Sequence, residues 1–162
     1  MKVETSVSGI YVDQETGEPV VVLKEVDGGR SLPIWISSNE MLAMAIELAE
    51  GDCRPPRPLS HDLIGNVVQE LDAKILESVV CSLEDSIYKA RIVLESETGY
   101  LELDCRPSDA IIMSLKSGGP IFVASQVFED RIHLTKADGN NPEDVWDRLQ
   151  EVRPDDLDGQ NL

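Results

Sequence analysis

The amino-acid sequence predicts an α+β fold: an internal pseudo-repeat of three antiparallel strands plus a helix, forming a bent or barrel-like sheet flanked by helices. Two observations carry this prediction. Three strand-like segments precede a helix twice, over residues 3–50 and again over residues 73–118. The two helices also begin alike, because residues 37–46 and 106–115 run from polar to apolar in the same order. A unit of this size buries little core alone, so we expect the two units to share one core.

The first unit is expected to contain three strands joined by tight turns. Apolar residues alternate loosely in the first segment, a short apolar run forms the second, and a Gly-Gly turn precedes the third. Strands joined by short loops are antiparallel neighbours by default. The expected strands are residues 3–12, 20–23 and 32–36. Ser37, with Glu40 three residues later, forms a capping-box sequence and predicts a helix that runs to about Glu50.

A proline-rich connector and a second helix follow the first unit. Residues 53–58 contain three prolines and two arginines, so we expect an extended connector and neither helix nor central strand. Ser60 is expected to cap the next helix. Five apolar residues fall on one face of this helix, which we therefore expect to pack against the core. They are Leu63, Ile64, Val67, Val68 and Leu71.

The second unit repeats the pattern of the first. Its expected strands are residues 73–82, 86–96 and 100–104. Pro107 suits the first position of the following helix because it has a fixed φ and no N–H. Asp109 then falls at the third position, where its carboxylate can reach back to the unpaired amides and meet the positive end of the helix dipole. The Gly-Gly-Pro sequence at 118–120 ends this helix.

The C-terminal part contains shorter elements and an acidic end. The expected elements are a strand at residues 121–123, a helix near 125–130, a terminal helix from about 141 to 149, and a frayed tail at 151–162. The Asn-Pro-Glu-Asp sequence at 141–144 predicts the start of the terminal helix, because it combines an N-cap with a proline at the first helical position. We therefore expect a single domain over residues 1–135, followed by a helix and acidic tail over residues 136–162.

The charge of the chain is strongly unbalanced. The sequence has 31 acidic residues against 14 basic ones, for a formal net charge of −17. At about 1 M salt the Debye length is roughly 3 Å, so the self-repulsion of such a chain is screened. We therefore expect a halophilic protein with an acidic surface, from the cytoplasm of a salt-accumulating microbe; an ordinary acidic protein is the alternative. The three cysteines lack C-x-x-C spacing and indicate reduced thiols, and no apolar run is long enough to cross a bilayer.

Two sequence motifs carry a family resemblance. Residues 57–63 are R-P-L-S-H-D-L, and residues 104–111 are D-C-R-P-S-D-A-I. With these motifs and the G-P-I-F-V sequence at 119–123, the chain resembles the bifunctional nuclease family over roughly residues 3–130. Cys105 stands where the family commonly has alanine. Because some members of that family degrade both RNA and DNA, the resemblance implies a nuclease that hydrolyses phosphodiester bonds.

The resemblance also implies a set of site residues. Arginines can clamp a phosphate and neutralise charge in the transition state, carboxylates can hold Mg²⁺ or Mn²⁺, and a histidine can act as general base or acid. The implied catalytic residues are Arg57, His61, Asp62, Arg106, Ser108 and Asp109. The expected ligands of Mg²⁺ or Mn²⁺ are Asp62 and Asp109 from the motifs, together with Glu40, which the internal repeat places at the position of Asp109; no organic cofactor is expected.

The same residues have a structural interpretation. The three acids stand in the first turns of expected helices, where acids are favoured as caps, and the two arginines can pair with them as structural salt bridges. His61 can be an ordinary polar residue of a first turn. The chain offers no metal-ligand spacing such as H-E-x-x-H, and its negative charge provides little counterion release to drive binding to nucleic acid.

Three function classes remain open from the sequence. The first is a nuclease with RNA or DNA as substrate. The second is a non-catalytic module that binds a small anion at the joint between the arginines and the helix starts. The third is an oligomeric regulatory module in which the motif residues are structural. Strand edges left by a bent sheet, and apolar residues near element ends, also favour a homo-oligomer.

Overall fold

The sheet and helices are seen in a computed structural model, which describes residues 1–50, 54–137 and 143–153, with side chains described except at 132–137. The elements are β1 (Lys2–Asp13), β2 (Pro19–Glu25), β3 (Ser31–Trp35), α1 (Ser38–Leu48), α2 (Ser60–Glu70), β4 (Lys74–Glu84), β5 (Ile87–Ser96), β6 (Gly99–Cys105), α3 (Pro107–Ser117), β7 (Ile121–Ala124), α4 (Ser125–Ala137), α5 (Asp144–Asp147) and β8 (Leu149–Val152). The α+β prediction is confirmed, and three strands followed by a helix occur twice, as β1–β3 with α1 and as β4–β6 with α3.

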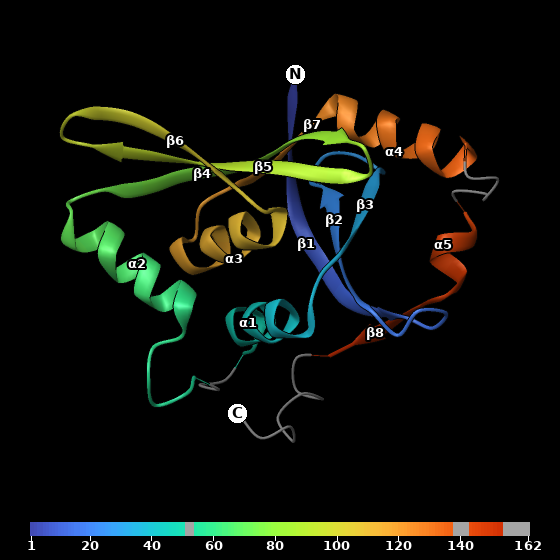
Figure 1. Ribbon diagram of the computed structural model, residues 1–162, viewed down its shortest axis with the longest axis horizontal. Coiled ribbons are helices and arrows are strands. Elements are labelled where there is room, and N and C mark those ends of the chain that lie inside the picture. The colour runs from blue at the N-terminus through green and yellow to red at the C-terminus, as the bar shows by residue number, and fades with distance from the viewer. Residues whose placement is uncertain (51–53, 138–142, 154–162) are drawn as a thin grey trace.

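One sheet contains all eight described strands. Seven of them are neighbours in the order β3-β2-β1-β7-β4-β5-β6. Strand β8 pairs with β1 but is not part of this order. The short strand β7 joins the two units, because it pairs antiparallel with β1 and parallel with β4. The strands of the two units run in different directions across the molecule (Figure 1), so the sheet is bent. It is open, with β3 and β6 at its two ends among the described strands.

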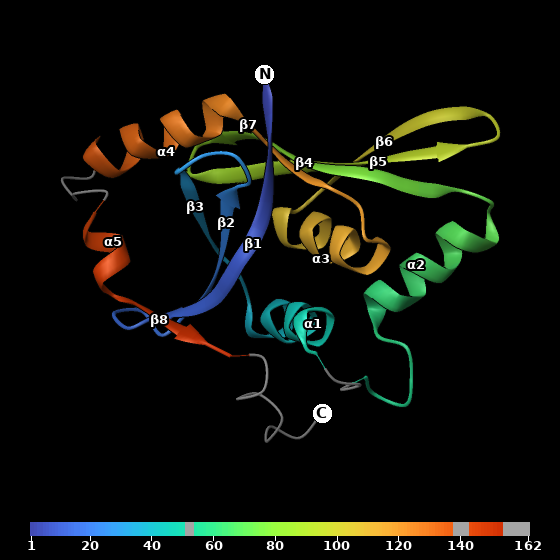
Figure 2. The ribbon, with the colours of Figure 1, turned by 180° about the vertical axis from the view of Figure 1, so that it is seen from behind.

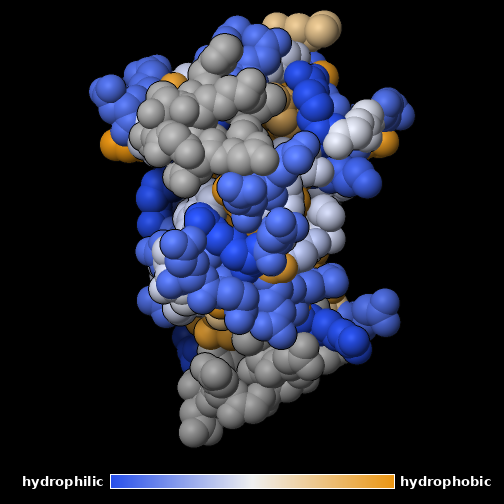
Figure 3. All heavy atoms as spheres, turned by 90° about the vertical axis from the view of Figure 1, so that its right-hand side faces the viewer, coloured by the Kyte–Doolittle hydropathy of each residue, from blue (hydrophilic) through white to orange (hydrophobic). Residues whose placement is uncertain are grey.

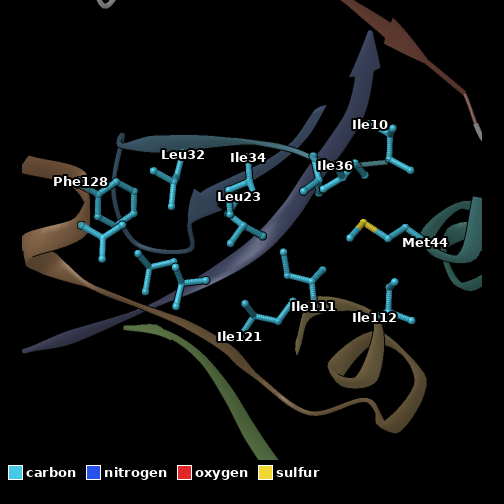
Figure 4. Close-up of a cluster of buried hydrophobic side chains, with 14 of the residues drawn as sticks. Ile10, Leu23, Leu32, Ile34, Ile36, Met44, Ile111, Ile112, Ile121 and Phe128 are labelled. Atoms are coloured by element: carbon cyan, nitrogen blue, oxygen red, sulfur yellow. The ribbon is translucent and has the colours of Figure 1, made fainter. Parts of the chain in front are cut away.

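The larger core lies between the first unit and helices α1 and α3. Side chains from β1, β2, β3, both helices, β7 and α4 meet there (Figure 4), and the labelled examples include Leu23, Ile34, Met44, Ile111 and Phe128. A smaller core, with Ile92, Leu94 and Met113 among its residues, lies between α3 and the strands β4–β6. Helices α3 and α4 lie on opposite sides of β4 and β7 (Figures 1 and 2). Helix α3 therefore serves both cores, and the two units share packing as expected.

The prediction that the apolar face of α2 packs against the core is wrong. No residue of α2 is buried, and only Val68 packs against the smaller core. Four of the five apolar residues on that face are exposed: Leu63, Ile64, Val67 and Leu71. The predicted N-cap is also one residue late, since Leu59 precedes the helix and Ser60 is its first residue. Helix α2 is held instead by polar contacts at its N-terminus.

The C-terminal elements differ from the expectation. The predicted terminal helix is too long, because α5 ends at Asp147 and strand β8 follows at Leu149–Val152. Strand β8 pairs with β1, and Arg148 before it contacts the fully buried carboxylate of Asp13. The expected N-cap at 141–142 and the tail from residue 154 lie outside the described residues. No described helix is long and apolar enough to span a membrane.

Candidate functional site at three helix N-termini

Three acidic residues occupy the same position in three helices. Glu40 is the third residue of α1, Asp62 of α2 and Asp109 of α3. The N-termini of α1 and α3 meet through Arg106, the N-cap of α3, whose Nη1 lies 2.6 Å from Oε1 of Glu40. Helix α2 joins them through His61, its second residue. The site therefore gathers three helix starts, each with unpaired amides and a positive dipole end.

Glu40 caps its own helix and also binds the second unit. Its Oε2 accepts a hydrogen bond from the Ser37 backbone N–H at 2.7 Å, which confirms the predicted capping box. Its Oε1 accepts from the hydroxyl of Ser108 at 2.8 Å and faces Arg106. Burial raises the pKa of Glu40, but these hydrogen bonds and the Arg106 charge outweigh burial and hold the pKa below its ordinary value. The buried carboxylate is therefore charged and fully engaged.

Asp109 does not cap its helix, contrary to the prediction from its position. Its Oδ2 accepts from Nε of Arg106 at 2.8 Å, and its Oδ1 accepts from Nη2 of the same guanidinium at 3.0 Å. Nε2 of His61 also lies 3.0 Å from Oδ1. Burial raises the pKa of Asp109, but the contacts with Arg106 and His61 outweigh it, so the pKa is lowered. Asp109 therefore joins His61 on α2 to Arg106 at the start of α3.

A cavity of about 530 Å³ opens beside this cluster. It is lined by Glu40, Arg106 and Ser108 on one side, with Trp35 and Tyr88 among its other walls. The Arg106 side chain is 66% exposed, whereas Ser108 is buried. Two of the five N–H groups of the guanidinium donate to Asp109, and Nη1 forms an ion pair with Glu40, which leaves N–H groups on Nη1 and Nη2 for another partner. Arg106 can therefore reach an anion in this cavity while it keeps its carboxylate partners.

Asp62 belongs to a second ionic cluster. Its Oδ2 accepts the backbone N–H of Leu59 at 2.7 Å, and its Oδ1 contacts Nζ of Lys116. Lys116 also donates to Glu47 at 2.7 Å, and Arg54 donates to the same carboxylate at 2.9 Å. The contact with Lys116 is the main cause that lowers the pKa of Asp62. This cluster ties α2 to α1 and α3. It shares no residue with the His61–Asp109 contact.

The sequence did not predict the role of Lys116, Glu47 and Arg54. Lys116 stands in the last turn of α3, where a cation is favoured by the helix dipole alone, so its position carried no signal of a long-range partner.

Arg57 is exposed, and no ion pair joins it to the described residues. Burial is the main cause that raises the pKa of Cys105 to about 11, which disfavours its thiolate form at neutral pH.

The carboxylates offer no ready cation site as they are arranged. The described residues contain no group of three His, Cys, Asp or Glu side chains placed to hold a metal ion. Both oxygens of Glu40 and both of Asp109 already accept from Arg106, Ser108, His61 or a backbone N–H. A metal ion there would have to displace the Arg106 guanidinium. As they are arranged in this structure, the residues do not fit such an ion. Binding of Mg²⁺ or Mn²⁺ stays a prediction, and it requires these contacts to rearrange.

Comparison with known proteins agrees with the motifs. The sequence profile of the bifunctional nuclease domain matches residues 21–135, which include α1, α2, α3 and every residue of the candidate site. Two proteins of Mycobacterium tuberculosis, "Uncharacterized protein MT1877" of strain CDC 1551 / Oshkosh and "Uncharacterized protein Rv1829" of strain ATCC 25618 / H37Rv, are each 32% identical to this chain over 164 residues. The alignments cover 95% of this chain and 97% of each relative. With the fold, the two motifs and these matches together, the chain belongs to the bifunctional nuclease domain family.

Proposed function

We propose that the protein is a nuclease that hydrolyses phosphodiester bonds of RNA, DNA or both at the cluster of Glu40, His61, Arg106 and Asp109. The observation that carries the proposal is the 3.0 Å contact between Nε2 of His61 and Oδ1 of Asp109, two residues that lie 48 positions apart. A histidine oriented by a carboxylate is a common general base or acid. Family membership supports a nucleic acid as the substrate.

In this proposal Arg106 and the helix starts bind the scissile phosphate. The two outward N–H groups of Arg106 donate to its oxygens, and the amides at the N-termini of α1 and α3 add positive potential. As charge develops on the phosphate in the transition state, the guanidinium stabilises it. Glu40 and Asp109 hold Arg106 in place, and Asp109 also holds His61.

His61 supplies the proton transfer. Held by Asp109, the imidazole removes a proton from the attacking hydroxyl group or water, or donates one to the leaving oxygen. Ser108 is buried and donates to Glu40, so we assign it a positioning role. Arg57, on the exposed connector, contributes at most to binding of the nucleic-acid chain. No step of this scheme is routed through a metal ion.

We further propose that the protein works in the salt-rich cytoplasm of a halophilic microbe. The net charge of −17 supports this, because such a chain repels itself and nucleic acid in dilute buffer. Hydrophilic residues cover most of the described surface on the face with β8, α4 and α5 (Figure 3). Concentrated salt weakens long-range attraction to nucleic acid, so binding rests on the short-range contacts of Arg106.

The test is cleavage of single-stranded RNA and DNA in molar KCl, with Mg²⁺, Mn²⁺ or a chelator. We compare the unchanged protein with Asp109→Asn and His61→Gln, and use Glu129→Gln on the exposed surface of α4 as the matched carboxylate control. We expect cleavage that both site variants lose while their melting remains cooperative and Glu129→Gln keeps full activity. Equal cleavage by all four proteins would point to a contaminating nuclease and contradict the proposal. The chelator arm separately tests the metal prediction.

A second candidate is a module that binds a small anion without cleaving it. The convergence of helix N-termini beside a cavity of about 530 Å³ favours it, because such termini bind anions without a metal. Absence of cleavage, together with an increase in melting temperature with inorganic phosphate that Arg106→Ala abolishes, would replace the nuclease proposal with this one.

A further inference from the structure

Helix α2 presents an apolar face that its own chain does not cover. Leu63, Ile64, Val67 and Leu71 are 60%, 47%, 49% and 71% exposed. The segment 63–69 contains no charged residue, in a chain that is 28% charged. A surface helix normally turns its apolar stripe to a core and its charged residues to water. Helix α2 instead leaves these four residues of its apolar stripe in contact with water, and within the described chain nothing covers them.

Strand β6 presents a second uncovered apolar face. Leu101 pairs with Leu94 and Leu103 pairs with Ile92, and paired residues of antiparallel strands point to the same side of the sheet. Leu94 and Ile92 are buried in the smaller core with residues of α3. Helix α3 packs on β4 and β5, but Leu101 and Leu103 remain about half exposed. The sheet layer therefore extends one strand beyond the helix that covers it.

We propose that these two faces are the contact between copies of this chain, with α2 of one copy lying on β6 of another. A helix face and a sheet face are the two surfaces that pack together in layered domains. The described residues include an uncovered face of each kind, and α2 and β6 lie at the same end of the molecule (Figures 1 and 2). Two copies related by a two-fold axis cover both faces at once, because each α2 meets the β6 of its partner.

Size and charge favour a second copy over other partners. The six side chains of the two faces together expose an apolar area on the order of 500 Å², more than half of the roughly 800 Å² that each partner buries in a standard interface. A chain of net charge −17 is repelled by anionic lipid surfaces and by nucleic acid. A second copy meets the same repulsion, except through an uncharged face such as residues 63–69.

The assembly also bears on the candidate site. His61 lies at the start of α2, and within its own chain α2 has no buried residue. A neighbouring copy on the apolar face fixes the helix that carries the histidine. This consequence rests on the proposed function, whereas the assembly itself does not, because sedimentation reports the mass of the assembly and not its activity.

The test is a charge pair across the contact. Val67→Glu on α2 and Leu101→Lys on β6 each place a charge on one of the two faces, at positions where the side chain is about half exposed and the fold tolerates it. Sedimentation velocity in molar KCl should show an oligomer for the unchanged protein and monomers for each variant. An equimolar mixture of the two variants should assemble again. In a mixed dimer, the new carboxylate on α2 of one copy faces the new ammonium group on β6 of the other. The other α2–β6 contact of that dimer carries neither substitution and stays apolar.

The matched control is Val26→Lys, an exposed apolar residue after β2 and outside both faces, which should assemble like the unchanged protein. A monomeric unchanged protein at about 100 µM would overturn the proposal, since interfaces of this size class commonly reach micromolar Kd or better. So would an oligomer that both variants leave intact, or one that only the α2 variant dissociates, because α2 then packs on α2. A tetramer or larger ring with an even number of copies that mixing restores also supports the proposal, since the two variants then alternate and use the same contact head to tail.

Discussion

The hydroxyl of Ser108 on α3 donates a hydrogen bond of 2.8 Å to Oε1 of Glu40 on α1. The two residues come from equivalent helices of the two repeat units, and both are buried. Glu40 also closes the capping box of α1, so one carboxylate both starts a helix and joins the halves. The site and the joint between the units are therefore the same place, and changes there affect stability as well as function.

Ser108→Ala should lower the free energy of unfolding by about 1–3 kcal/mol, because it leaves a buried carboxylate oxygen with one hydrogen bond fewer. Urea unfolding in molar KCl measures this. Ser6→Ala, on the exposed side of β1, is the control and should stay within about 0.5 kcal/mol of the unchanged protein. Equal losses in both variants would show that the Ser108–Glu40 bond contributes nothing.

Lys116→Met should destabilise the protein by up to about 3 kcal/mol, because it leaves the neighbouring carboxylates of Glu47 and Asp62 with Arg54 but without the less exposed of these two cations. The double variant Lys116→Met with Asp62→Asn should recover part of the loss, and the recovery measures the coupling. Urea unfolding is again the measurement. If the single and double variants unfold alike, Lys116 does not neutralise Asp62 in solution.

Asp109→Asn should change the dependence of stability on pH. The pKa of Asp109 is lowered in the folded protein from an ordinary value near 3.8. Its carboxylate therefore adds stability that is present above about pH 4 and is lost as the pH falls through the lower folded value. Melting curves from pH 7 to pH 3 should show the unchanged protein above the variant at neutral pH and the two converging in acid. A constant difference across this range would contradict the assigned contacts with Arg106 and His61.

Added KCl should raise the melting temperature. At 0.1 M salt the Debye length is about 10 Å, so the acids of a chain with net charge −17 repel one another across its surface; at 1 M it is about 3 Å. Differential scanning calorimetry from 0.1 to 3 M KCl measures the effect. The control is a variant with five exposed acids changed to their amides, which should need less salt for the same melting temperature. A melting temperature independent of KCl would contradict the halophilic proposal.

Much of the fold was predictable because its signals are local. The capping box at Ser37 and Glu40 and the proline at the start of α3 are short-range geometry, and the structure confirms both. Strand β8 was not predictable in this way. It is four residues long, and its pairing with β1 depends on residues far away in the sequence.

Helix α2 shows a different limit. Its apolar period predicts a buried face, but a period says only that something covers the stripe, not that the same chain does. The candidate site has the same limit. Spacing placed Glu40 and Asp109 at equivalent positions, yet one caps its helix and the other holds His61. That difference arises from the placement of α2, which no local pattern encodes.

The position of β7 has a consequence for synthesis of the chain. The strand lies between β1 and β4, but it follows both units in the sequence. While the chain emerges from the ribosome, the edge of β1 that pairs with β7 therefore stays unpaired until residues 121–124 have been synthesised. Pairing of Lys2 with Ala124 spans most of the described chain, and contacts of such separation form slowly. The strand that joins the two units thus sets the earliest moment at which the two parts of the sheet can pair in a nascent chain.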